Sequence, residues 1–185
     1  MHIQLQEVVS LIYGLWGRYG GMLNLHFLKK IRRNHGLEHA TITIAHSKMG
    51  EPGILGGNST QWGFFVYGDV PIDMLSQAAE EALERLRAGE KELAVSPYCG
   101  TNLVVAAALT GLACAWALGS ERRWSDSPRV VFASLMALVA SKPIGTQVQR
   151  YFTTTGAVGR LRIKDIDHIR LGSLTVHRVR TYSED

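Results

Sequence analysis

The chain is poor in cysteine: among its 185 residues only Cys99 and Cys114 occur. So low a count argues against a disulfide-rich secreted scaffold and suits a reducing compartment. The sequence also lacks a basic start followed by an apolar run and a small-residue cleavage site, so a cleavable signal peptide is not expected. Internal repeats and low-complexity segments are missing as well. The length then predicts one domain, or a small domain with appendages.

A strong excess of one charge is also missing. Lysine and arginine number 20 against 16 aspartates and glutamates, which gives a formal net charge of +4 and a sequence pI of about 9.2. The basic residues do not alternate with aromatic residues along a periodic face, and aromatic residues make up only 8% of the chain. Nucleic acid is therefore not an expected partner.

Apolar residues make up 46% of the chain, and they gather in two runs. Residues 103–118 carry no charge, and with their flanking residues they approach the roughly 20 residues that a membrane span needs. A shorter run covers residues 130–140 and ends at Lys142-Pro143. Two helices joined by a charged link predict a transmembrane or re-entrant hairpin over residues 101–145. The alternative is a buried hairpin of a soluble helical bundle.

Lysine and arginine are more frequent on the flanks of this hairpin than in its link, although the link carries Arg122 and Arg123. The positive-inside rule then places both termini in the cytoplasm of a multi-pass protein of the cell membrane. The basic residues from Lys29 to Arg33 either attract anionic lipid headgroups or form a solvated face. Membrane lipid and other membrane-protein subunits are the expected partners.

The five residues HGLEH, from His35 to His39, have the pattern H-x-x-E-H, the inverse of the zinc-protease signature. On a helix, residues four apart lie one turn above each other, so both histidines can offer imidazole nitrogens to one ion. Glu38 projects in nearly the same direction and could hold or deprotonate a water molecule. The motif predicts a zinc site, because imidazole suits zinc and hydrolysis needs no redox change. The alternative is a helix end with two partly buried histidines.

The segments on either side of the motif predict helices and a hairpin. Apolar spacing predicts an amphipathic helix at residues 3–17, either at the membrane interface or packed on the protein. A second helix is expected from about residue 22 through the motif. A β-branched strand at residues 41–46, a glycine-rich loop at 50–57 and a strand at 62–68 then predict a hairpin.

The remaining segments complete an α+β pattern. Residues 71–88 have the apolar stripe of a helix, with Pro71 at its start and Gly89 as its stop. Residues 161–182 alternate apolar and polar side chains in two pieces, which predicts two short strands that join the earlier hairpin in one sheet. The predicted fold class is an α+β membrane protein, with a small antiparallel sheet on a helical hairpin.

We expect four parts along the chain. Interfacial helices occupy residues 1–34, and a cytoplasmic α+β region with the metal site occupies residues 35–100. The membrane hairpin follows at residues 101–145. A cytoplasmic tail at residues 146–185 completes the sheet.

Several segments together resemble known families. HGLEHAT, the later PYCGTN, the apolar hairpin and GTQVQRYFTTT resemble the YqhQ-like bacterial family, described as metal-dependent membrane enzymes. Those proteins show His-Gly-Ala-Glu-His and His-Pro-Arg-Cys-Gly-Thr segments before membrane helices. The chain is also similar to a group of short membrane proteins of unknown function in cyanobacteria and green filamentous phototrophs. They share the N-H-x-L-E-H-A-T run, the Y-G-D-V segment and the C-G-T-N turn, and the likeness covers most of residues 30–180.

The resemblance implies a ligand set and one departure from the family pattern. It implies that His35, His39 and Cys99 bind the metal, with Glu38 as acid and base; a cysteine thiolate is also a good zinc ligand on chemical grounds. Where the family has a histidine before the proline of the cysteine turn, this chain has Ser96. Three histidines are possible substitutes, or else half-exposed members of strand pairs: His46, His168 and His177.

Two functions of different classes follow. The first is a membrane-bound zinc-dependent hydrolase, a peptidase, acting at the cytoplasmic membrane surface with Glu38 as general base. The second is a non-catalytic membrane subunit or assembly factor in which the metal only joins the motif helix to the Cys99 turn. A fourth protein ligand would favour the second, because structural zinc sites are closed and catalytic sites keep an open position.

Overall fold

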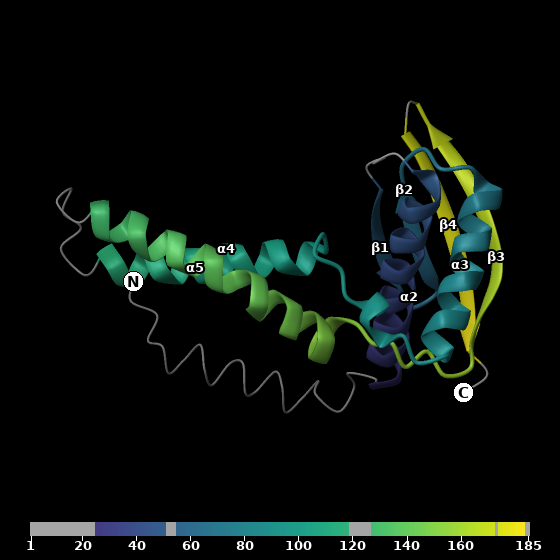
Figure 1. Ribbon diagram of the computed structural model, residues 1–185, viewed down its shortest axis with the longest axis horizontal. Coiled ribbons are helices and arrows are strands. Elements are labelled where there is room, and N and C mark those ends of the chain that lie inside the picture. Colours follow the sequence, from purple (N-terminus) through teal and green to yellow (C-terminus); the bar gives the residue numbers. More distant parts are fainter. Residues whose placement is uncertain (1–24, 51–54, 119–126, 173, 184–185) are drawn as a thin grey trace, which may run out of the picture.

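The computed structural model describes residues 25–50, 55–118, 127–172 and 174–183. The amphipathic helix expected at residues 3–17 lies outside these residues, as do Arg122 and Arg123 of the link. Within them the chain is α+β, as the sequence predicts, with four α-helices and one antiparallel sheet. Figure 1 shows two parts: the sheet with two helices against it, and a helical hairpin that extends away from it.

The motif lies inside helix α2 (Leu25–Met49), which also contains the expected domain boundary at residue 34. The predicted strand at residues 41–46 is wrong, because α2 continues through it. Two features favour the helix over the β-branched composition. The hydroxyls of Thr41 and Thr43 donate to the carbonyls four residues earlier, which is compatible with a helix. Apolar side chains at helical spacing are buried in the core, and this packing outweighs local propensity: Leu37, Ala40, Ile44 and Ala45.

The sheet has four strands in the order β1-β2-β4-β3, all antiparallel. Their bounds are β1 (Gly56–Thr60), β2 (Gly63–Tyr67), β3 (Leu161–Leu171) and β4 (Leu174–Ser183). The strand expected at residues 62–68 is confirmed, and so is the pair of tail strands that joins it in one sheet. The hairpin partner is not the one expected: β1 begins at Gly56, inside the segment predicted to be a loop, and continues to Thr60.

Helices α2 and α3 (Ile72–Arg87) pack on the sheet and enclose the core with it. The predicted helix at residues 71–88 is therefore confirmed. Pro71 occupies its N-cap position without a capping side-chain hydrogen bond, and Gly89 follows its C-terminus with a φ of 102°, a conformation that glycine adopts readily. A short 3₁₀-helix, η1 (Lys91–Ala94), then leads to the cysteine turn.

The hairpin consists of α4 (Gly100–Leu118) and α5 (Ser127–Val148), followed by one π-helical turn, η3 (Gln149–Thr153). The expected end of the second helix at Lys142-Pro143 is wrong, because α5 continues past Pro143. A proline removes only one helical hydrogen bond, and close packing holds the continuation. A Cβ atom added at Gly145 would lie 2.5 Å from Oδ1 of Asn102 on α4.

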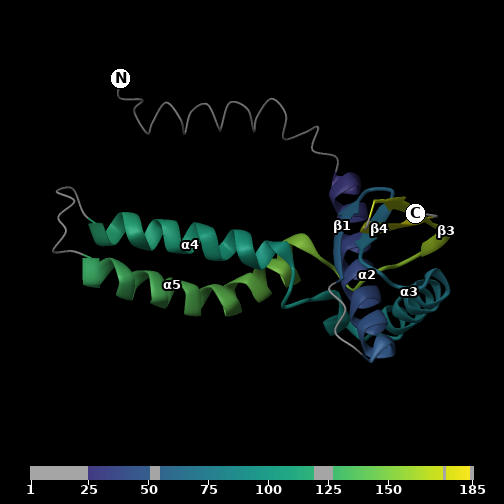
Figure 2. The same ribbon diagram turned by 90° about the horizontal axis from the view of Figure 1, so that it is seen from above.

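The two hairpin helices expose apolar side chains along their length. Leu103 is 74% exposed, Trp116 74% and Phe132 66%. By length and composition, residues 100–118 and 127–153 each form a helix that is long and apolar enough to cross a membrane. Cys99 lies directly before the first of these helices and Thr153 at the end of the second, so both ends of the hairpin meet α2 (Figure 2).

Candidate metal centre

Three metal-ligand side chains from distant parts of the sequence meet at one point. His35 and His39 lie one turn apart on α2, and Cys99 comes from the turn before α4. One possible ligand atom from each lies within 4.8 Å of the other two. The two imidazole rings are 4.4 Å apart between centroids. The three residues implied by the family resemblance are thus brought together, and the group could hold a metal ion.

Two backbone carbonyls orient the imidazole rings. Nδ1 of His35 lies 2.9 Å from the carbonyl oxygen of Thr153, and Nδ1 of His39 lies 2.9 Å from that of Ala94. A carbonyl can only accept a hydrogen bond, so Nδ1 carries the proton in both rings. In the neutral imidazole this leaves the Nε2 lone pair free to bind an ion. Such carbonyl partners are the usual support of metal-binding histidines.

Cys99 is nearly buried, 9% exposed, and lies against the histidines. Its Sγ is 3.4 Å from Nε2 of His35 and accepts a hydrogen bond from the backbone N–H of Thr101 at 3.4 Å. Burial raises the pKa of the Cys99 thiol, but hydrogen bonds with the His39 side chain and with Thr101 outweigh burial and bring this pKa below its ordinary value. The thiolate is the form that binds metal ions.

A buried glutamine holds the turn that carries Cys99. Gln149 is fully buried; its Oε1 accepts from the N–H of Ser96 at 3.0 Å, and its Nε2 donates to the carbonyl of Ser96 at 2.9 Å and to Oδ1 of Asn102 at 2.7 Å. Asn102 donates in turn to the carbonyls of Ser96 and Pro97. The amide groups of two hairpin helices therefore fix the position of the Cys99 turn.

The segment that supplies the Thr153 carbonyl is also fastened to α2. Nη2 of Arg32 donates to the carbonyls of Tyr151 and Thr154, at 2.9 and 3.1 Å. A Cβ atom at Gly36 would collide with the carbonyl oxygen of Thr155, so the glycine of the motif permits this close approach. Arg32 belongs to the cluster expected to attract lipid, and here its guanidinium binds the protein's own backbone.

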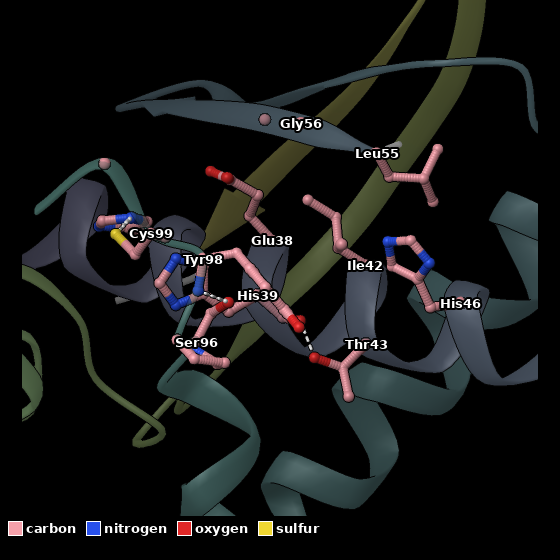
Figure 3. A pocket seen from close by; sticks show the side chains of 14 residues that line it. Glu38, His39, Ile42, Thr43, His46, Leu55, Gly56, Ser96, Tyr98 and Cys99 are labelled. Carbon is pink, nitrogen blue, oxygen red and sulfur yellow. Dashed lines mark hydrogen bonds between the residues drawn. The ribbon is translucent and has the colours of Figure 1, made fainter. Parts of the chain in front are cut away.

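Glu38 points to a different neighbour from the histidines. Its side chain extends toward β1 (Figure 3), and its Oε2 accepts a hydrogen bond from the hydroxyl of Ser59. A Cβ atom at Gly57 would lie 2.5 Å from Oε1, so the glycine leaves room for the carboxylate. Burial raises the pKa of the Glu38 carboxyl, and Ser59 and His35 offset this only in part. Glu38 does not belong to the three-residue ligand group.

A cavity of about 740 Å³ opens beside the ligand group. One wall is a face of α2 that runs from His35 to His46, a second is the start of β1 at residues 55–57, and a third is the cysteine turn at residues 96–100. Glu38 lines the same cavity as the three ligands. No lysine or arginine lines it among the residues that the structure describes.

The histidines considered as substitutes for the missing family histidine do not join the group. His46 lines the far part of the cavity, on α2 and not on a strand. His168 and His177 face each other on β3 and β4 and line a separate cavity of about 250 Å³. Ser96 instead stabilises its own turn, because its hydroxyl accepts from the N–H of Tyr98 at 3.2 Å.

Sequence reasoning missed the residues that support the ligands. Gln149, Asn102 and the Thr153 carbonyl all lie in segments that the resemblance includes, PYCGTN and GTQVQRYFTTT, but their role was not expected. Gly57 ends the glycine-rich segment at residues 50–57, whose composition resembles an ordinary loop, and Ser59 follows two residues later. Only the family likeness could have pointed to the first three.

A comparison with protein-family models covers all of these residues. A family model described as a domain of unknown function (DUF6391) matches residues 30–166. An uncharacterized protein of Picosynechococcus sp. is 40% identical over 136 residues, which are 67% of this chain and 65% of that protein. The chain therefore spans about 65% of the length of this relative. No solved structure matches the chain.

Replacing Gln149 with alanine should release the Cys99 turn. Unmade hydrogen bonds of buried groups cost about 1–3 kcal/mol, so the turn should open at least about five times more often. In metal-free Cys114→Ser protein, Gln149→Ala should speed maleimide labelling of Cys99 by about that factor or more. Gln147→Ala is the matched control, because Gln147 is exposed and lies two residues earlier, near the end of α5. Equal labelling rates in the two variants would contradict the role of Gln149 in holding the Cys99 turn.

Proposed function

The chain belongs to the family described as a domain of unknown function (DUF6391), and we propose that it is a membrane-bound, zinc-dependent hydrolase of peptide bonds. The observation that carries the proposal is the three-residue ligand group on the wall of an open cavity. Among the described residues no fourth histidine, cysteine or carboxylate joins the group. Three protein ligands and an accessible fourth position are typical of catalytic zinc sites.

The donor set favours zinc over harder or redox-active ions. One thiolate and two imidazoles make a borderline-soft site, which suits zinc, whereas magnesium and calcium prefer oxygen ligands. His35, His39 and Cys99 would hold the ion, with the Thr153 and Ala94 carbonyls orienting the rings. A bound zinc ion would supply Lewis acidity, which polarises a carbonyl and lowers the pKa of water.

The remaining chemistry falls to the side chains of the chain. Hydrolysis adds water to the carbonyl carbon of an amide and breaks its C–N bond. Glu38, on the cavity wall, would accept a proton from the water and return it to the leaving nitrogen. Ser59 would hold the carboxylate in place.

The hairpin and its surroundings support a membrane location. Apolar side chains on α4 and α5 are exposed over the length of both helices, which costs free energy in water and is favourable in lipid. Tyr98 is 94% exposed, and Tyr151 and Phe152 are also exposed, all at the end of the hairpin that meets the metal centre. Aromatic residues favour the membrane–water interface. The centre would then lie at the membrane surface, on the cytoplasmic side by the positive-inside rule.

One observation favours the second candidate, a membrane subunit or assembly factor with a structural metal site. The Glu38 carboxylate is engaged by Ser59 and packs against Gly57. A carboxylate that fastens α2 to β1 needs no catalytic role. The YqhQ-like resemblance fits either candidate, and lipid and other membrane subunits are the partners proposed for both.

The protein should remain in membranes that are washed with alkaline carbonate. Two apolar helices of membrane-spanning length hold a protein in the lipid core, whereas a surface-bound protein detaches. The measurement is immunoblotting of the pellet and the wash, with a peripheral protein as the control. Release into the wash would contradict integral insertion through the hairpin.

The purified protein should contain about one equivalent of zinc. His35→Ala, His39→Ala and Cys99→Ala should each lower the zinc content strongly, because each removes one of three ligands. Cys114→Ser is the control: Cys114 lies within α4, where its Sγ is 3.1 Å from the hydroxyl of Ser134. Elemental analysis of detergent-purified protein measures the content. Unchanged zinc in Cys99→Ala would exclude the three-ligand set.

Glu38→Gln separates the two candidate functions. If Glu38 is the general base, the variant keeps its zinc and loses turnover by about 100-fold or more, because an amide cannot accept the proton. If Glu38 only supports the site, zinc affinity falls by about 10- to 100-fold instead. Glu84→Gln, on the exposed face of α3, is the matched control. Zinc titration of both variants needs no knowledge of the substrate.

A further inference from the structure

The strand above the cavity is a free edge of the sheet. β1 stands first in the strand order and pairs with β2 alone among the described strands. Its first three residues are exposed. Figure 2 shows β1 on the side of the sheet that faces the hairpin, with β3 on the far side. An unpaired edge is a template for another strand.

The register of β1 and β2 identifies the groups that point outward. Thr60 pairs with Gly63 across a two-residue turn, so this closing pair is hydrogen-bonded. Hydrogen-bonded and non-bonded pairs then alternate along the ladder. Gly57 and Ser59 fall in non-bonded pairs, so their N–H and C=O groups point away from β2. The free edge therefore offers two donor–acceptor pairs.

A strand added at this edge would lie over the metal centre. β1 runs antiparallel to α2, because Thr60 contacts Asn34 and Ser59 contacts Glu38, while Leu55 lies near Ile42. β1 contacts Glu38 through Ser59, and the Glu38 side chain also lines the cavity. The cavity continues beyond β1 along the stripe of α2 that holds the two ligand histidines, and it reaches His46. The eleven helical steps from His35 to His46 span roughly 16 Å, the length of about five residues of extended chain.

The chemistry of the cavity suits a polypeptide backbone. No lysine or arginine lines it among the described residues, so no side chain of fixed positive charge there would bind a phosphate or another anion. Gly56 and Gly57 line the cavity and carry no side chains, so the start of β1 leaves space beside the ligand group. Peptide amides are neutral, and they alternate donors and acceptors at the spacing of the free edge.

We propose that the substrate of this centre is an extended, uncharged polypeptide segment that adds to β1 as a fifth strand. The proposal rests on the hydrolase function proposed above, since it names the substrate class of the same site. Main-chain hydrogen bonds to Gly57 and Ser59 would hold the segment. About five of its residues would lie along the stripe, and one of its carbonyls would face the open position beside His35, His39 and Cys99.

Amide hydrogen exchange of the full chain in detergent tests this pairing. The probe is a decapeptide library drawn from Ala, Val, Ser, Thr and Gln. At saturation it should slow exchange in β1 by about tenfold, at Gly57 and Ser59. The same library N-methylated at every residue should have no effect, because it cannot donate main-chain hydrogen bonds. Exchange at the opposite edge of the sheet, in β3, should stay unchanged.

A pair of variants tests where the segment lies. Ile42→Trp would fill the cavity beneath the added strand and should weaken the protection of β1 by tenfold or more. Ser47→Trp, exposed on α2 and outside the cavity, should leave it unchanged. Exchange in β2 reports whether each variant is folded. A folded Ile42→Trp protein with full peptide protection would contradict the proposal.

Other outcomes overturn the pairing or separate it from the hydrolase function. Unchanged exchange in β1, or equal protection by the N-methylated library, overturns the proposal even if peptides are cleaved. The proposal is also overturned if exchange in β1 slows without peptide when the protein concentration is raised or lipid is added. A second copy of the chain or lipid would then occupy the free edge of β1. Protection in both wild type and Cys99→Ala without cleavage in either supports the strand pairing and contradicts the hydrolase.

Discussion

Two hydrogen bonds between imidazole rings and backbone carbonyls connect the parts of this protein. His39 donates to Ala94, just before the first hairpin helix, and His35 donates to Thr153, just after the second. Adjacent turns of one helix therefore hold both ends of the hairpin. The same bonds place the proton on Nδ1 and leave Nε2 to a metal. The attachment of the hairpin and the capacity to bind a metal ion thus depend on the same two side chains.

The hairpin in turn positions the third ligand. Gln149 at the end of α5 and Asn102 at the start of α4 share a hydrogen bond and together hold the turn before Cys99. Gly145 lets the two helices approach closely at this level. Because buried amides are costly to leave unpaired, a shift of one hairpin helix relative to the other would move the Cys99 turn. The geometry of the metal centre is therefore sensitive to the packing of the hairpin.

The centre combines buried polar side chains with an open cavity. His39 and Glu38 are almost inaccessible, at 4% and 3% exposure, yet both line a cavity of about 740 Å³. The glycine-rich start of β1 and the small side chains of the cysteine turn leave this space unfilled. A site with only a structural role could close around its ion, whereas the free edge and the cavity leave room for a substrate. The open cavity beside the ligand group therefore favours the proposed hydrolase over a structural metal site.

The local pattern of apolar and polar residues was enough to predict several helices and strands. The stripe at residues 71–88 predicted α3, the alternation at residues 161–182 predicted β3 and β4, and the uncharged run predicted α4, because their packing preferences agree with their local periodicity. Histidines four apart on a helix must share one face, so two of the three ligands followed from the motif, and the family likeness supplied Cys99.

Tertiary contacts determined the conformation of residues 41–46 and of β1, and the partners of the two ligand histidines. Residues 41–46 are β-branched but helical, because burial of Ile44 and Ala45 outweighs a propensity of a few tenths of a kcal/mol per residue. GGNST has little strand propensity and becomes β1 through pairing with β2 and contact with α2. The carbonyl partners of His35 and His39 lie 118 and 55 residues away. A backbone carbonyl has no sequence signature, so only the folded chain could show which ones orient the ligands.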